Sequence, residues 1–174
     1  MQATQNSETA INPKLIVPFV NSVRSVFSTM VGTETMLDRP HIKAQPAPTY
    51  DVSSIIGFSG DVIGSVVVSF QRSAAEKLVE AFAGAPIPFE SPDFADAIGE
   101  LANMIAGGAK QHLGKMATLT MPNVILGQGH MITRLSDVPC IVIPCRTAVG
   151  AFAVEVSVKQ LASAEVNTLQ KEEA

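Results

Sequence analysis

Residues 91–116 carry the longest helical pattern in the sequence. Drawn as an α-helix, one side of this stretch holds Phe94, Ile98, Leu101, Ile105, Ala109, His112 and Met116. Most of these side chains are apolar and recur every three or four residues, which predicts a helix of five or more turns with one buried face. Ser91 is a favoured N-cap residue and Pro92 a favoured first helical residue, so the helix is predicted to begin there.

The opposite side of this helix is predicted to be short, flat and polar. It holds Asp96, Gly99, Glu100, Asn103, Gly107, Lys110 and Gly114. Each glycine inside a helix costs about 0.8–1 kcal/mol relative to alanine, so helix stability is lost in exchange for flatness. A flat side would let another macromolecule approach closely, with Glu100 and Asn103 as its tallest groups. A solvated helix side is the more frequent explanation of such residues, and the spacing alone leaves both explanations open.

A second long helix is predicted near the N-terminus. The Asn12–Pro13 pair is a favourable start, and apolar residues then recur at helical spacing until Gly32, a favourable end. Pro18 removes a backbone hydrogen-bond donor. The helix therefore either kinks at Pro18 or begins near Val17, with the proline in its first turn.

Several strands are predicted around these helices. Residues 50–58 and 62–70 are β-like and flank a turn, which predicts a β-hairpin. Further strands are predicted at residues 41–45, 124–126, 131–135, 140–143 and 151–158. Pro139 and Pro144 flank the strand at 140–143, so this strand is expected to lie at a sheet edge or to contain a bulge.

The order of these elements predicts the fold class. Residues 73–76, Ser-Ala-Ala-Glu, match a capping box and predict a short helix that ends at Gly84. Helix, strands, short helix, long helix and strands together predict an α+β fold of two layers, in which the two long helices pack on one face of a mostly antiparallel sheet. We expect a single domain over residues 12–160, a disordered tail at 1–11 and a polar C-terminal tail at 161–174.

The composition argues against several classes of protein. The net charge is −4, whereas proteins that bind nucleic acids are usually basic. The N-terminus lacks a basic start followed by an apolar run, and no apolar run approaches the roughly 18 residues needed to span a bilayer. We therefore expect a cytoplasmic protein that contacts neither membrane nor nucleic acid.

No metal site is expected from the residues that commonly bind metals. His41, His112 and His130 are scattered, and no histidine–cysteine group has zinc spacing. His112 lies towards the core side of the long helix and is expected to be buried. Cys140 and Cys145 should point to opposite faces of a strand about 16 Å apart, at about 3.3 Å per residue, which is too far for a disulfide. Two thiols in a reducing compartment are the expected state.

The polar side of the long helix resembles a known signature. Asp96-x-x-x-Glu100-x-x-Asn103 is similar to the D/S-x3-E-x2-N motif of the CheC/CheX/FliY family of chemotaxis phosphatases. Residues 96–110 are most similar to the CheX branch, and the resemblance extends over about residues 12–159. CheC proteins typically carry two copies of E-x-x-N, and one copy is seen here. The resemblance implies the same two-layer fold and a homodimer built through the sheets.

The resemblance also implies a function and roles for the site residues. It implies a phosphatase that acts on the aspartyl phosphate of a CheY-like receiver domain. Asn103 would orient the attacking water, because a carboxamide both donates and accepts hydrogen bonds. Glu100 would pair with the receiver lysine, and Asp96, Gly99 and Gly107 would contact the receiver.

No cofactor of its own is expected for this chain, because the Mg²⁺ belongs to the receiver domain. The alternative function is a non-catalytic adaptor, in which the same helix binds a receiver domain or a flagellar or signalling partner without hydrolysing the phosphate.

Overall fold

The computed structural model describes residues 12–44, 50–114, 116–133 and 138–161. Its helices are α1 (Pro13–Val26), which continues as a π-helical turn η1 (Phe27–Val31), α2 (Arg72–Ala83) and α3 (Pro92–Lys110). Its strands are β1 (Met36–Leu37), β2 (His41–Ile42), β3 (Val52–Ser59), β4 (Val62–Phe70), β5 (Thr118–Leu119), β6 (Asn123–Leu126), β7 (Ile141–Thr147) and β8 (Gly150–Gln160). The expected tail at 1–11 lies outside the described residues, as does all but the first residue of the tail expected at 161–174.

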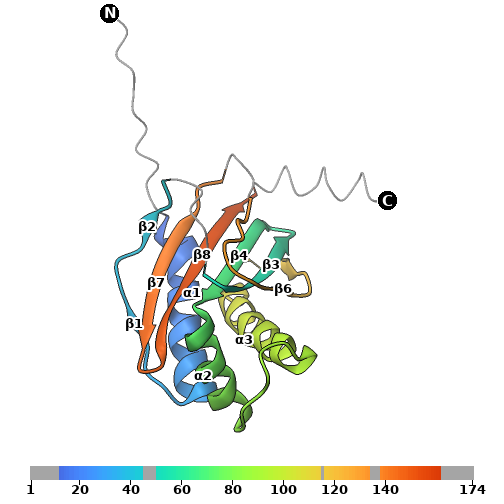
Figure 1. Ribbon diagram of the computed structural model, residues 1–174. Helices are drawn as coiled ribbons and strands as arrows, with labels where there is room; N and C mark the ends of the chain where they lie inside the picture. Colours follow the sequence, from blue (N-terminus) through green and yellow to red (C-terminus); the bar gives the residue numbers. More distant parts are fainter. Residues whose placement is uncertain (1–11, 45–49, 115, 134–137, 162–174) are drawn as a thin grey trace, which may run out of the picture.

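The strands form one antiparallel sheet, and the helices pack on one of its faces (Figure 1). The strand order is β1-β7-β8-β4-β3-β5, with β2 also paired to β7 and β6 also paired to β3. The predicted α+β fold of two layers is therefore confirmed, as is the β3–β4 hairpin.

Helix α3 begins as predicted and ends earlier than predicted. The Ser91 hydroxyl accepts a hydrogen bond from the Phe94 N–H at 3.2 Å, and Pro92 is the first helical residue. After Lys110 the chain tightens, because the Leu113 N–H bonds to the Lys110 carbonyl three residues back. This turn places Leu113 in the core, so the predictions of a helix to residue 116 and of a buried His112 were wrong: His112 and its neighbour Gln111 are exposed.

Helix α1 begins at Pro13 and runs through Pro18, so the alternative start near Val17 is wrong. Asn12 caps it by accepting a hydrogen bond from the Lys14 N–H at 3.1 Å. Gly32 ends the helical segment in a left-handed conformation with φ 71°, as predicted.

Helix α1 crosses α3 at close range. The Ser22 hydroxyl donates a hydrogen bond of 2.8 Å to the Ile105 carbonyl of α3. A Cβ placed on Gly108 would lie only 2.3 Å from the Ser22 Oγ, so the crossing requires a glycine there. The polar side of α3 is consequently fixed in orientation relative to the sheet.

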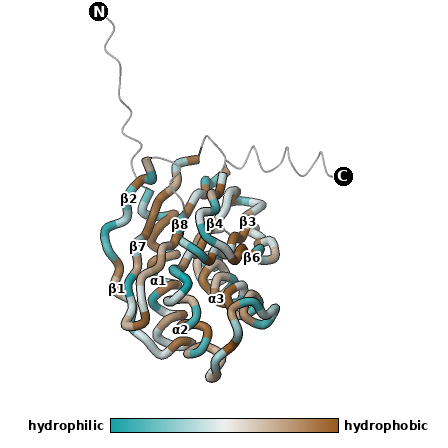
Figure 2. The backbone as a smooth tube through the Cα atoms, viewed as in Figure 1, coloured by the Kyte–Doolittle hydropathy of each residue, from teal (hydrophilic) through white to brown (hydrophobic). Residues whose placement is uncertain are grey.

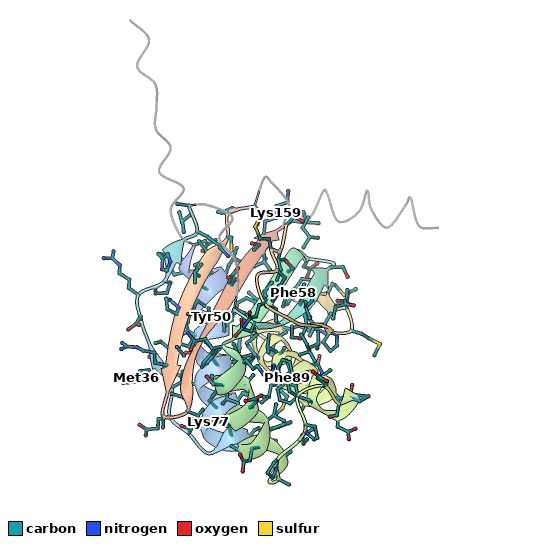
Figure 3. All side chains as sticks on the ribbon, viewed as in Figure 1. Met36, Tyr50, Phe58, Lys77, Phe89 and Lys159 are labelled. Carbon is teal, nitrogen blue, oxygen red and sulfur yellow. The ribbon has the colours of Figure 1, made fainter. Side chains whose placement is uncertain are left out.

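Helix α2 does not use the predicted capping box. It begins at Arg72, and the residue before it, Gln71, makes no side-chain cap bond. The Arg72 N–H instead donates to the Asp51 carboxylate at 3.2 Å, so a partner from before β3 satisfies the first turn. Gly84 ends the helix with φ 76°, as predicted. Phe89 of the linker is labelled in Figure 3. Its ring lies 4.0 Å below the Arg72 guanidinium of α2 and 5.0 Å from the Phe94 ring of α3.

The C-terminal strands differ from the prediction in extent. Strand β7 runs through Pro144 to Thr147 and pairs with β8 on one side and with β1 and β2 on the other, so it is not an edge strand. The two short strands leave a gap beside Pro144, whose carbonyl accepts from the Asp38 N–H at 2.9 Å. Residues 131–133 are not in a strand, and residues 134–135 of the predicted strand at 131–135 lie outside the described residues. Residue 45, the last residue of the predicted strand at 41–45, also lies outside them.

Aromatic contacts hold the helices on the sheet. Phe152 of β8 stacks on Phe27 at 4.5 Å and on Phe70 at 5.3 Å between ring centroids. Phe58 of β3 meets Phe19 of α1 edge to face. Figure 2 shows hydrophobic residues along the strands that face these helices. Since such residues lose most of their water contact on folding, they supply the main stabilisation of the two layers.

Candidate functional site: the polar side of α3

A groove runs along the polar side of α3, between this helix and the segment that leads into β6. Figure 1 shows where α3 and β6 lie in the fold. Its cavity volume is about 680 Å³. One wall is α3, through Ala95, Asp96, Gly99, Glu100 and Asn103. The other wall is the chain that follows α3, through Leu119, Thr120, Met121, Pro122 and Val124. The groove therefore has a mainly polar wall and a mainly apolar wall.

The two predicted catalytic residues lie together on the helical wall. Glu100 is exposed and Asn103 is half-buried. They are one turn apart, which corresponds to a rise of about 4.5 Å along the helix axis. Within the described residues, neither side chain forms a hydrogen bond or an ion pair with the rest of the protein. Both groups are therefore available to a molecule that enters the groove.

Asp96 and Gly107 lie at either end of this pair. Asp96 is exposed and lines the groove one turn before Glu100. Gly107 lies one turn after Asn103, outside the groove lining, and a Cβ placed there would meet nothing within 4 Å. The helix surface at Gly107 is therefore open, as the sequence predicted.

Gly99 occupies a different environment from the one predicted. It is buried, and a Cβ placed on it would lie 3.3 Å from the Pro122 Cγ and 3.5 Å from the Val124 Cγ2. The expectation that Gly99 lies on the open side of the helix was therefore wrong. Its missing side chain admits the second wall of the groove, which belongs to the same chain.

The second wall was not found from the sequence. Strand β6 pairs with β3, and the segment just before it is tied to Gly57 of β3 by two hydrogen bonds. The Thr120 hydroxyl accepts from the Gly57 N–H at 2.9 Å, and the Thr120 N–H donates to the Gly57 carbonyl at 3.0 Å. A Cβ placed on Gly57 would lie 3.0 Å from the Thr120 Cγ2. A glycine inside a strand pattern often marks such a close approach or a bulge. That glycine was the one available signal.

The residues of the groove limit the chemistry that it can perform. Asn103 can donate and accept hydrogen bonds at once, and Glu100 can accept them from a cation. Within the described ranges, no three His, Cys, Asp or Glu side chains gather as a metal site. The groove can thus position a water molecule and a positive group that a partner brings to it.

None of the described helices is long and apolar enough to cross a membrane.

The two cysteines lie apart from this groove. Cys145 is buried in the core, and burial raises the pKa of its thiol from 9.0 to about 12. Cys140 is half-buried and its sulfur lies 3.9 Å from the Glu155 carboxylate, which also pairs with Lys43 at 3.0 Å. Neither cysteine is in a disulfide.

Comparison with known proteins places this groove in a family context. The family model described as "Chemotaxis phosphatase CheX" matches residues 52–146. The CheY-P phosphatase CheX of Thermotoga maritima is 29% identical over 122 residues, which are 68% of this chain and 79% of that protein. The chemotaxis protein CheX of Desulfovibrio desulfuricans superposes with a TM-score of 0.76 at 34% identity, over 85% of this chain and 99% of that one.

A further solved structure shares the fold. It is the CheX–CheY–BeF3–Mg²⁺ complex from Borrelia burgdorferi, in which the matching chain has a TM-score of 0.68 and 21% identity, over 84% of this chain and 98% of that chain. The family model covers more than half of the chain and includes all of α3 and both walls of the groove. With its E-x-x-N pair on the helical wall, this chain belongs to the CheX family of chemotaxis phosphatases.

Proposed function

We propose that this chain hydrolyses the aspartyl phosphate of a CheY-type receiver domain. The observation that carries the proposal is the position of Glu100 and Asn103 on one wall of an open groove in a member of the CheX family. Neither side chain has a hydrogen-bond or ion-pair partner among the residues that the structure describes. The Thermotoga maritima relative is named a CheY-P phosphatase, and a CheX of the same fold forms a complex with CheY. A CheY-type receiver is therefore the substrate that the family relationship favours.

The proposed reaction is hydrolysis of the acyl phosphate bond. A water oxygen bonds to phosphorus, the bond between phosphorus and the aspartate oxygen breaks, and the products are inorganic phosphate and the free receiver aspartate. The receiver supplies the Mg²⁺ and the lysine that stabilise the phosphoryl charge. This chain would supply no cofactor of its own. What remains is to hold a water in line with the breaking bond, a positioning role that a neutral side chain can fill.

Asn103 is the proposed positioning group for that water. Its carboxamide can accept a hydrogen bond from the water and donate another to a phosphoryl oxygen. A carboxylate at the same place would repel the phosphoryl group. Glu100, one turn earlier, would pair with the receiver lysine and so fix the register in which the two proteins dock. Asp96 and Gly107 would contact the receiver on either side of the pair.

The experiment that tests this function is phosphate release from receiver domains. Each CheY-type receiver of the organism that supplies this chain is phosphorylated with acetyl phosphate, and its decay is followed with and without the protein. We expect faster decay for at least one receiver, and a loss of about a hundredfold in the stimulated rate for Asn103→Ala. Asn21→Ala, which removes an exposed asparagine from α1, is the matched control and should keep full activity.

Two results would contradict the proposal. Full stimulation by Asn103→Ala would show that the carboxamide does not position the water. Binding of the phosphorylated receiver with unchanged or slower decay would show the non-catalytic adaptor instead. The homodimer that the family resemblance implies stays a prediction, which the mass of the purified protein in light scattering tests. The cytoplasmic location expected from the composition also stays a prediction.

A further inference from the structure

Met121 is the most exposed large hydrophobic side chain in the described part of the protein. Its exposed fraction is 85%, against 63% for Met36 and 59% for Met116. It lines the second wall of the groove, opposite the helix that carries Glu100 and Asn103. An apolar side chain in water is unfavourable, so its presence beside a functional groove calls for an explanation.

The backbone around Met121 is firmly held. Thr120, the residue before it, forms two hydrogen bonds with Gly57 of β3, of 2.9 and 3.0 Å. The Thr120 hydroxyl also lies 3.2 Å from the Met121 carbonyl and donates to it. Pro122, the residue after it, packs over Gly99 of α3. Met121 is thus presented outward by a segment that is fixed on both sides, as a contact residue for a partner would be.

We propose that Met121 is a docking and specificity residue, which packs on an apolar surface of the receiver domain beside its phosphorylation site. This inference rests on the proposed function and deepens it. Met121 shares one groove with Glu100 and Asn103, so a protein that reaches those two groups must also pass over the methionine. A second copy of this chain in the same place would cover the proposed catalytic pair, which is why the receiver is the proposed occupant.

A methionine suits this contact for a physical reason. Its unbranched thioether side chain has three rotatable bonds and adapts to the shape of a partner surface. It touches no reacting atom in the proposed geometry, so it should contribute to binding and leave the chemical step unchanged. The polar wall would then provide the chemistry, and the apolar wall would select receivers with a matching apolar patch.

The test separates binding from chemistry. Receiver loaded with Mg²⁺ and BeF3⁻, which stands in for the phosphoryl group on the aspartate, gives Kd without turnover, and the phosphorylated receiver gives KM and kcat. The receiver used is the one that the unaltered protein dephosphorylates fastest. We expect Met121→Ser to raise both Kd and KM about tenfold with kcat changed less than about twofold. Met121→Leu should stay within about threefold of the parent protein in Kd.

Matched controls make the outcome decisive. Met36→Ser removes another exposed methionine, on β1, and should leave Kd, KM and kcat unchanged. The proposal is overturned if Met121→Ser keeps the parent Kd, if it lowers kcat alone, or if it changes only the mass of the protein in light scattering, which would assign the side chain to a contact between copies. Failure of the proposed function looks different: either Asn103→Ala would remain active, or the unaltered protein would bind the phosphorylated receiver without faster decay, whatever Met121 does.

Discussion

Pro122 lies over Gly99, with its Cγ 3.3 Å from the position that a Cβ on the glycine would occupy. This contact brings the segment before β6 against α3 and closes one side of the groove. A contact of this length is tighter than an ordinary van der Waals contact. Any side chain at residue 99 must therefore displace the second wall of the groove or strain the helix.

Gly99→Val is expected to weaken both stability and receiver binding. The added Cβ alone would lie 3.3 Å from the Pro122 Cγ and 3.5 Å from the Val124 Cγ2, and valine adds two methyl groups beyond it. The free energy of unfolding should therefore fall by about 1–3 kcal/mol, as for other overpacked sites. The displaced wall should also raise the Kd for the BeF3⁻-loaded receiver. Urea denaturation and a binding titration measure the two effects. Gly107→Val, the same change on the same helix where the site is open, should not destabilise; equal losses for both would contradict this account.

Gly107→Ala and Gly108→Ala should change stability in opposite directions. At Gly107 a Cβ meets nothing within 4 Å, so the gain in helix propensity should raise the free energy of unfolding by about 0.8–1 kcal/mol. At Gly108 the added methyl group collides with Ser22 and breaks its bond to the Ile105 carbonyl, which lowers stability. Denaturation curves measure both.

Receiver binding by Gly107→Ala tests a separate expectation. If the receiver lies flat on this part of α3, the methyl group should raise Kd even though the fold is more stable. An unchanged Kd would remove Gly107 from the proposed contact surface, while the stability prediction would stand by itself.

The roles proposed for Glu100 and Asn103 predict different kinetic defects. Glu100→Gln removes the charge that would meet the receiver lysine, so Kd should rise about tenfold or more. Asn103→Asp keeps the size of the side chain and adds a negative charge near the phosphoryl group, so kcat should fall about a hundredfold or more. Stopped-flow phosphate release and binding titrations separate the two. A pure kcat loss for Glu100→Gln would exchange the assigned roles.

The buried thiol predicts how stability depends on alkaline pH. Burial raises the pKa of Cys145 from 9.0 to about 12, so between these pH values the unfolded chain loses the thiol proton while the folded chain retains it. The stability that this thiol contributes is complete below pH 9.0 and is lost as pH rises through this window. Cys145→Ala should therefore show a shallower fall in unfolding free energy from pH 8.5 to about 11 than the parent protein.

Cys140→Ala is the control for that measurement. It leaves the buried thiol of Cys145 in place, so the part of the alkaline fall that Cys145 causes should persist. A slope equal to that of the parent protein in Cys145→Ala would show that the thiol does not titrate differently in the folded and unfolded states.

Local signals in the sequence predicted the starts of the long helices. Ser91 and Pro92 act within one turn of chain, and Asn12 and Pro13 do the same for α1, so their effect does not depend on the rest of the fold. The start of α2 was missed because the partner of its first turn, Asp51, lies across the hairpin. A capping pattern competes with such distant partners, and the sequence does not reveal which one is used.

The site was half predictable for a similar reason. Glu100 and Asn103 follow from the spacing of a family motif on a helix, and the structure places them together. Gly99 and Gly107 looked alike, yet eight residues at 100° per residue separate them by about 80° around the axis, enough to turn one towards the sheet. The wall that covers Gly99 depends on the register of β6 on β3, and strand register between distant segments is not written in a local pattern.

Both sides of the groove come from one uninterrupted stretch, Ala95 to Val124, with Gly57 as their outside anchor. A family member could thus change which receiver it prefers by substitutions within this one stretch, without changes elsewhere in the fold. Grafting that stretch between two relatives should carry the choice of receiver with it, provided that the glycine on β3 is kept.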